Sequence, residues 1–283
     1  MGGLNDEAAK QEKIRNKARF NESIKKYKGD IDVIDKRIKL MEKDIRTKKD
    51  ALNGYRHVII ANEYLKIIGL YCAMNDESVQ IMNFKNENYL NEARKLIYQV
   101  LIHLEDVVTP HIDIPPNDLE DKLEAIAKLN PQRKLNLLNA IGFRIQQVVD
   151  AFGDNTKWKW SFVEIDGRYA VVTKNMIDYR VAIANNDPRK PYYVENLNLM
   201  RMVKEQLEKA SRRYREKYEQ TTKETEDIKK SIAFIAAMRR ILILMGQSEE
   251  ANKYKRIMEL ATNLMEENIK KKEAEKRAPA KKK

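Results

Sequence analysis

Hydrophobic residues between positions 20 and 59 recur at helical spacing. From Ile24 to Ile45 the steps alternate between three and four, and the positions between are almost all Lys, Arg, Asp or Glu. This heptad pattern puts one narrow apolar stripe along a helix and predicts that the stripe packs against a second helix. We therefore predict a single helix from about Asn5 to Asn75. The stripe comprises Phe20, Ile24, Tyr27, Ile31, Ile34, Ile38, Met41, Ile45, Leu52, Tyr55 and Ile59.

A second stretch of this kind runs from Val194 to Gly246. Its steps are again three and four, with one additional step of four between Tyr214 and Tyr218, which unwinds a supercoil locally without breaking it. Neither stretch contains proline, and both exceed an average globular helix. We predict that the two run antiparallel as a coiled-coil stalk. The second stripe comprises Met200, Val203, Leu207, Ala210, Tyr214, Tyr218, Thr221, Thr225, Ile228, Ile232 and Ile235.

The residues between these stretches predict a bundle of shorter helices. Pro110, Pro115 and Pro116 predict an extended loop, since proline lacks a backbone N–H and disfavours helix in the residue before it. Pro131 suits the first turn of a helix. The predicted helices cover about Tyr89–Val108, Asp118–Leu129 and Pro131–Phe152, with a polar connection over Asn75–Asn88.

Two structures compete for the segment after the third of these helices. Asp166 and Gly167, between apolar runs, are typical of a β-hairpin with a type I′ turn. Adjacent apolar pairs break the alternation that a strand needs, however, and the apolar steps from Trp158 to Ile183 alternate between four and three. We therefore predict a helix over about Asn155–Ala184.

These elements predict an all-α fold. We expect an elongated molecule in which two long antiparallel coiled-coil stalk helices carry a multi-helix bundle at one end. Near the C-terminus Gly246 ends one helix and Ser248 caps the next, which predicts a helical hairpin. The predicted division is a stalk helix at 1–55, a bundle at 56–192, a returning stalk helix at 193–230, a hairpin at 231–269 and a disordered basic tail at 270–283.

Composition narrows the class of protein. Charged residues make up 35% of the 283 positions and glycine only 9 of them, which favours helix over sheet. A hydrophobic content of 42% excludes a disordered chain. The sequence has no apolar run long enough to span a membrane. The single cysteine, Cys72, excludes an internal disulfide and a multi-cysteine zinc site, and we expect a buried, inert thiol there.

Half of the net charge of +12 lies in the last fourteen residues, which hold eight basic and two acidic side chains. A basic tail can bind nucleic acid, an anionic membrane or an acidic protein. This tail has no aromatic side chain on which a base could stack. We therefore expect a solvated tail and do not expect nucleic acid as a partner.

The chain offers few groups for catalysis or metal binding. The segment HLEDVVTPHID contains ligand types that metals use, yet its spacing fits no metal motif, and Pro110 places its two histidines on different elements. We expect surface polar side chains there and a core or boundary position for His57. Phosphate-binding loops, nucleophile elbows and metalloprotease motifs are lacking, so we predict no catalytic, cofactor or metal site and no enzyme. The candidate ligands in the segment are His103, Glu105, Asp106, His111 and Asp113.

The candidate partner-binding residues are basic and aromatic. Three arginines beside two tyrosines on the second long stretch are predicted to face outward. They form either a solvated face of the stalk or a docking strip for an acidic partner. One tryptophan lies off the apolar stripe of its segment, and aromatic side chains anchor many protein interfaces. The candidates are Arg212, Arg213, Tyr214, Arg215, Tyr218 and Trp160.

The segment NTKWKWSFVEIDGRYAVVTKNMIDYR, at positions 155–180, adds a family resemblance. Together with the chain length, the two long Lys/Glu-rich helices and the lysine-rich tail, it resembles the flagellar-coiling protein A family of spirochaete periplasmic flagella. The resemblance covers nearly the whole chain. It implies a bent, all-helical, non-enzymatic protein of the flagellar sheath that binds the flagellin core and other sheath proteins and imposes filament curvature for motility.

The resemblance also implies a periplasmic location, reached by a signal peptide that has been removed from this chain; without such a signal we expect the cytoplasm. The alternative is a cytosolic coiled-coil adaptor whose basic tail binds nucleic acid or an acidic protein. Charged helix faces make weak lateral contacts that add up along a filament. We therefore favour a structural assembly protein without a small-molecule substrate or cofactor.

Overall fold

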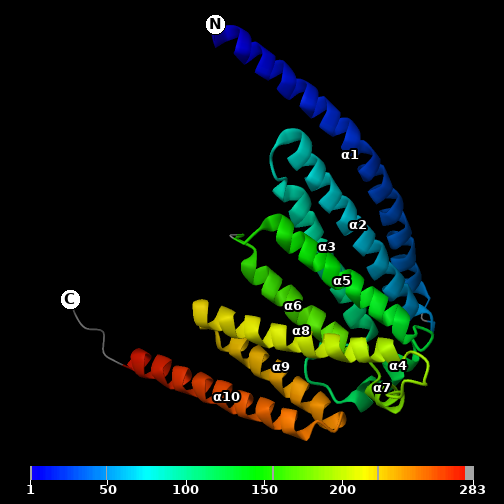
Figure 1. Ribbon diagram of the computed structural model, residues 1–283, viewed down its shortest axis with the longest axis vertical. Coiled ribbons are helices and arrows are strands. Elements are labelled where there is room, and N and C mark those ends of the chain that lie inside the picture. Colours follow the sequence, from blue (N-terminus) through cyan, green and yellow to red (C-terminus); the bar gives the residue numbers. More distant parts are fainter. Residues whose placement is uncertain (1, 49, 155, 222, 278–283) are drawn as a thin grey trace. The chain divides into compact units, whose positions relative to one another are not determined.

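The computed structural model describes residues 2–48, 50–154, 156–221 and 223–277. These residues form ten α-helices and one short 3-10 helix and include no β-strand, which confirms the predicted all-α class (Figure 1). The chain divides into two compact units. The first comprises Met1–Val107 and Asn136–Lys159, and the second comprises Val108–Leu135 and Trp160–Lys283.

The first long stretch is two helices, α1 (Gly2–Thr47) and α2 (Asn53–Met82), which pack against each other. The prediction of one continuous helix is therefore wrong. Local polar contacts hold the turn between them: the Asp50 carboxylate accepts a hydrogen bond from the backbone N–H of Leu52 at 3.0 Å and another from Arg56 Nη2 at 3.1 Å. A side chain that bonds to nearby backbone in this way competes with the helix.

The part of the predicted stripe that lies on α1 is buried or half-buried at every position, whereas Leu52 and Ile59, which were predicted to continue it, are 54% and 48% exposed. The partner of α1 is the next helix in the chain. Phe20 and Ile24 form a buried cluster with Met74 of α2. Because α2 returns along α1 and supplies the second apolar surface that the stripe requires, the stripe needs no partner from distant sequence.

Helix α2 extends into the region predicted as a polar connection and leaves a turn of only four residues, 83–86, before α3. Its polar residues hold the following turn: Asn75 Oδ1 accepts from the backbone N–H of Asn86 at 2.9 Å, and Ser78 Oγ donates to the carbonyl of Phe84 at 3.0 Å. The polarity of this segment therefore marks a turn contact, and helix persists to Met82.

The other elements follow the prediction with changed boundaries. Helices α3 and α5 have nearly the predicted bounds, whereas the helix expected over Asp118–Leu129 is reduced to one short helix followed by turns. Helix α3 packs on α2. The elements are α3 (Glu87–Val107), η1 (Pro116–Leu119), α4 (Glu120–Glu124), α5 (Pro131–Phe152), α6 (Lys159–Asn175), α7 (Tyr179–Ala184), α8 (Tyr193–Gln220), α9 (Thr225–Leu244) and α10 (Ser248–Arg277).

The segment after α5, for which the sequence allowed a β-hairpin or a helix, is helical. Its predicted helix is confirmed over α6, with an interruption before α7. The interruption has a local cause, because Asp178 caps α7: its Oδ1 accepts from the backbone N–H of Val181 at 3.1 Å. The Asp166-Gly167 pair lies inside α6 and forms no turn.

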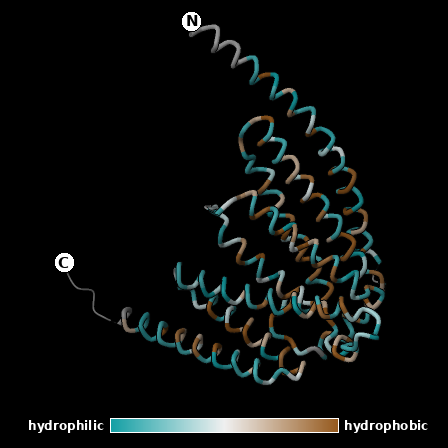
Figure 2. Tube along the Cα trace, viewed as in Figure 1, coloured by the Kyte–Doolittle hydropathy of each residue, from teal (hydrophilic) through white to brown (hydrophobic). Residues whose placement is uncertain are grey.

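The second long stretch also folds back on itself, as α8 and α9, so the prediction of a single helix over it is wrong. Thr221 Oγ1 donates to the carbonyl of Lys217 at 2.6 Å where α8 ends. The predicted stripe is nevertheless buried or half-buried at every position, because the reversal places its two halves on facing helices. Helix α9 packs on both α8 and α10 and carries more hydrophobic residues than either (Figure 2).

Helix α10 continues into the predicted disordered tail. Residues 270–277 are helical, which corrects the prediction for that part, and residues 278–283 lie outside the described range. The sequence here is rich in Lys, Glu and Ala, which are strong helix formers, and contains no proline before Pro279. Lys272 Nζ donates to the carbonyl of Lys223 at 2.7 Å.

Deleting residues 270–283 is expected to change the thermal midpoint by less than about 2 °C. The described side chains of this segment are exposed or half-exposed, and the Lys272 contact at the surface is worth about 1 kcal/mol or less. Differential scanning calorimetry of the full-length and shortened chains measures the shift. A fall of 5 °C or more would show that the tail packs, whereas any binding of the full-length chain to an anionic partner should weaken in the shortened one.

Candidate protein-binding groove

Helices α8, α9 and α10 form a layer in the second unit, with α9 in the middle. Small side chains bring α8 and α9 close together: Ser231 Oγ donates to the carbonyl of Ser211 at 2.9 Å. Direct bonds also join α8 to α10. Lys204 Nζ donates to Glu250 Oε1 at 2.7 Å, and the Tyr254 hydroxyl donates to Glu208 Oε1.

Beyond these bridges, α8 and α10 leave a groove of about 300 Å³ over α9. Its floor is apolar, and two arginines of α8, Arg212 and Arg215, lie along one edge. Ile257 of α10 is exposed on the opposite side, and Leu260, one turn further along α10, is 68% exposed. The floor and walls comprise Leu207, Ser211, Ser231, Phe234, Ile235, Met238, Ile257 and Ala261.

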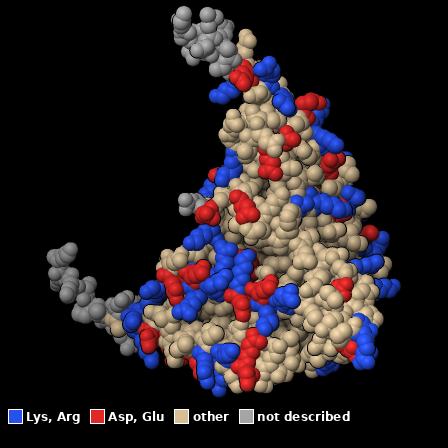
Figure 3. Space-filling model, viewed as in Figure 1, with Lys and Arg blue, Asp and Glu red and all other residues tan. Residues whose placement is uncertain are grey.

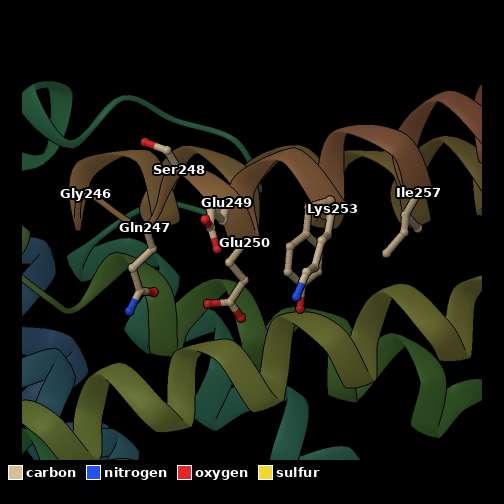
Figure 4. A pocket seen from close by; sticks show the side chains of 8 residues that line it. Gly246, Gln247, Ser248, Glu249, Glu250, Lys253 and Ile257 are labelled. Carbon is tan, nitrogen blue, oxygen red and sulfur yellow. The ribbon is translucent and has the colours of Figure 1, made fainter.

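A more open hollow of about 580 Å³ continues this groove toward the start of α10. Tyr254 and Ile257 line both hollows. Figure 4 shows Glu250 and Ile257 projecting from the same side of α10, and Glu250 is the residue that bonds to α8. Burial and the hydrogen bond to Glu208 raise the pKa of the Tyr254 hydroxyl, so that it stays a neutral donor at physiological pH. The two hollows therefore follow one side of α10.

The two edge arginines are exposed to solvent and carry only weak pairings within their own helix. Arg212, whose side chain is 73% exposed, lies 4.0 Å from Glu216, and Arg215 lies 2.9 Å from Glu219. Exposed pairs at this spacing contribute a few tenths of a kcal/mol each. Another carboxylate could therefore replace these partners at little cost. Figure 3 shows Lys and Arg gathered with acidic residues on this part of the surface.

The third predicted arginine points inward, which corrects the expectation that it faces outward. Arg213 Nη1 lies 2.5 Å from Asp166 Oδ2, and Lys209 Nζ lies 2.9 Å from Asp166 Oδ1. Asp166 is only 2% exposed. This buried carboxylate ties α6 to α8 through two cations. Arg213 is thus part of the internal packing and does not belong to the groove.

The predicted aromatic residues also lie apart from the groove. Tyr214 and Tyr218 are each 3% exposed, so the core of the unit holds them. The Tyr214 ring stacks on Phe234 at a centroid distance of 5.8 Å. Trp160 is half-buried near the start of α6 and does not line the groove. Of the six predicted partner-binding residues, only Arg212 and Arg215 lie at its edge.

The prediction of surface polar side chains around Pro110 holds for Asp106, His111 and Asp113, which are exposed, and is wrong for two residues of α3. His103 and Glu105 are each 9% exposed on α3 in the first unit. Asp113 belongs to the second unit, where it accepts from Arg240 Nε at 2.8 Å. Cys72 is buried as predicted, and burial raises the pKa of its thiol to about 11, which keeps it protonated.

The sequence predicted the two arginines at the edge of the groove but did not predict the apolar residues that form its floor. Phe234 and Met238 are ordinary apolar residues of α9, and their spacing indicates only a buried helix face. The groove arises because the chain reverses after Gln220 and again after Leu244, which brings three helices together. Within the described part of the chain, no helix is both long and apolar enough to cross a bilayer.

Comparison with known proteins identifies a family. Residues 16–269 match the model of the TP0443 family, which is named for a protein of the spirochaete genus Treponema. No curated protein matches the chain. A solved structure described as a computational design of self-assembling cyclic protein homooligomers aligns with 89% of this chain and 96% of its own. The identity is 14% and the TM-score 0.29, which is too low to indicate a shared fold.

Proposed function

The chain belongs to the TP0443 family, and we propose that it is a non-enzymatic structural protein that binds helical protein partners in the groove along α10. The observation that carries this proposal is the combination of an apolar floor with two exposed arginines at one edge. An amphipathic helix binds to such a groove with its apolar face down. Acidic residues along one side of that helix would pair with Arg212 and Arg215.

The two parts of the groove have different roles in binding. Apolar surface removed from water supplies most of the affinity, at roughly 25 cal/mol per Å². The arginines fix the direction and register of the partner and speed its approach, while each exposed pair adds at most about 1 kcal/mol. One such contact is weak, but many identical contacts along a filament hold each subunit firmly.

We further propose that the assembly is the sheath of a flagellar filament, with the flagellin core and other sheath proteins as partners and filament curvature and motility as the outcome. Two observations support this choice. The residues at 155–180 and the helical composition resemble the flagellar-coiling protein A family, and the matched family is named for a spirochaete protein. In this role the protein acts in the periplasm.

Reversing both edge arginines, Arg212→Glu with Arg215→Glu, is expected to reduce binding to isolated flagellar filaments at least tenfold. The reversal puts two negative charges where the partner helix carries its acidic side, and like charges repel. The fold should be unaffected because neither side chain is buried. Co-sedimentation with filaments stripped of this protein measures binding, and circular dichroism checks the fold.

The matched control reverses two exposed arginines that do not line the groove, Arg201→Glu with Arg256→Glu, and changes the net charge equally. It should bind as the unaltered chain does. Equal loss in both variants would mean that net charge, and not the groove, governs binding. Normal curvature and motility in a strain that lacks the protein would reject the flagellar role while leaving the groove to be tested with other partners.

A further inference from the structure

Two histidines from different helices face each other in the first unit. His57 lies in the second turn of α2 and His103 in the second-last turn of α3. Their Nδ1 atoms are 3.0 Å apart, and their ring centroids are 5.2 Å apart. His103 is buried and His57 is half-buried, so the two rings are held by their surroundings.

A carboxylate completes the group from the same end of α3. Asp106 is three residues after His103 and therefore lies on the same side of the helix. Its Oδ2 lies 3.7 Å from His57 Nδ1. One ligand atom from each of the three residues falls within 4.8 Å of the others. Two imidazole nitrogens and one carboxylate oxygen thus lie close together between α2 and α3.

We propose that His57, His103 and Asp106 bind a divalent transition-metal ion, with Zn²⁺ as the best match. Zinc binds nitrogen and carboxylate oxygen at about 2.0–2.2 Å in tetrahedral geometry, which places neighbouring ligand atoms about 3.3–3.5 Å apart. The separations of 3.0 and 3.7 Å from His57 Nδ1 lie within a few tenths of an ångström of this range, and the third separation, which is within 4.8 Å, closes by rotation of the half-exposed Asp106 side chain. Imidazole ligands favour zinc, copper and nickel over magnesium and calcium.

The surroundings of His103 fit a metal ligand. Glu42 of α1 lies on the far side of the ring, with its Oε1 3.9 Å from His103 Nε2. The Tyr64 hydroxyl donates to the same oxygen at 3.5 Å, which holds the carboxylate in place. Metal-binding histidines commonly donate their second N–H to a carboxylate, which fixes the tautomer and orients the other nitrogen. Glu42 makes no hydrogen bond to His103 at 3.9 Å, but a side-chain shift of about 1 Å would let it accept from Nε2–H and leave the Nδ1 lone pair facing His57 and Asp106.

The charge of the group also suits a cation. Burial is the main cause that lowers the pKa of both imidazoles, so both are neutral at pH 7 and have lone pairs to donate. A hydrogen bond between the two Nδ1 atoms would give the same 3.0 Å contact without a metal, and titration with zinc distinguishes the two cases. The bound ion would join α2 to α3 and, through Glu42, would brace α1.

Titrating the full chain with ZnCl₂ after treatment with EDTA is expected to show one binding equivalent by calorimetry. His57→Asn and His103→Asn should each abolish this equivalent, and Asp106→Asn should weaken it at least tenfold. Asp106 is half-exposed, so its variant tests the site without disturbing the core. Zinc at a hundredfold excess over Kd should raise the thermal midpoint by about 5 °C.

His111→Asn provides the matched control, because His111 is the remaining histidine of the chain and is exposed outside the group. It should bind one equivalent like the unaltered chain. Co²⁺ gives a second readout, since a tetrahedral cobalt site absorbs visible light and this absorption should vanish in His57→Asn. Absence of a saturable equivalent in the unaltered chain, or unchanged binding in folded His57→Asn and His103→Asn, would overturn the proposal.

Discussion

Replacing Asp166 with alanine is expected to lower the free energy of unfolding by about 3 kcal/mol. The carboxylate is buried between Lys209 and Arg213, at 2.9 and 2.5 Å. Its removal leaves two neighbouring cations without their shared counter-ion and opens a gap between α6 and α8. Breaking a buried pair costs about 3–5 kcal/mol, and the partial exposure of both cations places this case at the lower end.

Urea denaturation at pH 7, followed by far-UV circular dichroism, measures this loss. Glu226→Ala is the matched control, since Glu226 also pairs with a lysine, Lys229 at 2.8 Å, but both side chains are exposed. That variant should unfold at nearly the same urea concentration as the unaltered chain, because water screens an exposed pair. Equal losses in the two variants would show that the buried Asp166 contact contributes no more to the free energy of unfolding than an exposed ion pair does.

Replacing Gly167 with alanine is expected to destabilise the protein by about 1–3 kcal/mol. The usual expectation has the opposite sign, because alanine is favoured over glycine by about 1 kcal/mol inside a helix. At this position a Cβ atom would lie 2.6 Å from Cε2 of the Tyr214 ring. That ring is buried and stacked on Phe234, so it cannot move aside cheaply.

Gly29→Ala is the control, because at this position replacing glycine with alanine should have the usual stabilising effect. Gly29 lies inside α1, and a Cβ atom there would have nothing within 4 Å. Thermal and urea unfolding should show that this variant gains up to about 1 kcal/mol. Combining Gly167→Ala with Tyr214→Leu should cost less than the sum of the two single changes, because the smaller side chain removes the clash. A stabilised Gly167→Ala variant would contradict the close contact of α6 and α8.

Asp166 and Gly167 also show where local sequence signals mislead. As a dipeptide they are typical of a hairpin turn, yet they form the site where α6 meets α8. The aspartate provides the buried charge and the glycine makes room for the tyrosine ring. The apolar spacing predicted the helix correctly because it reports a whole segment, whereas the dipeptide reports only two residues. The roles of these two residues depend on α8, which packs against them and is distant in the sequence.

The sequence by itself determined the helical class and the buried side of each long helix. These follow from a repeat of three and four residues, which depends only on the geometry of one helix. The tertiary structure alone decided where the chain reverses and which surfaces meet. A heptad pattern can pack against any second apolar stripe, so it does not specify its partner. Closing a short turn costs little conformational entropy, so the chain can reverse at several places. The partners of Phe20, the groove over Phe234 and the meeting of His57 with His103 therefore depend on contacts between segments far apart in the sequence.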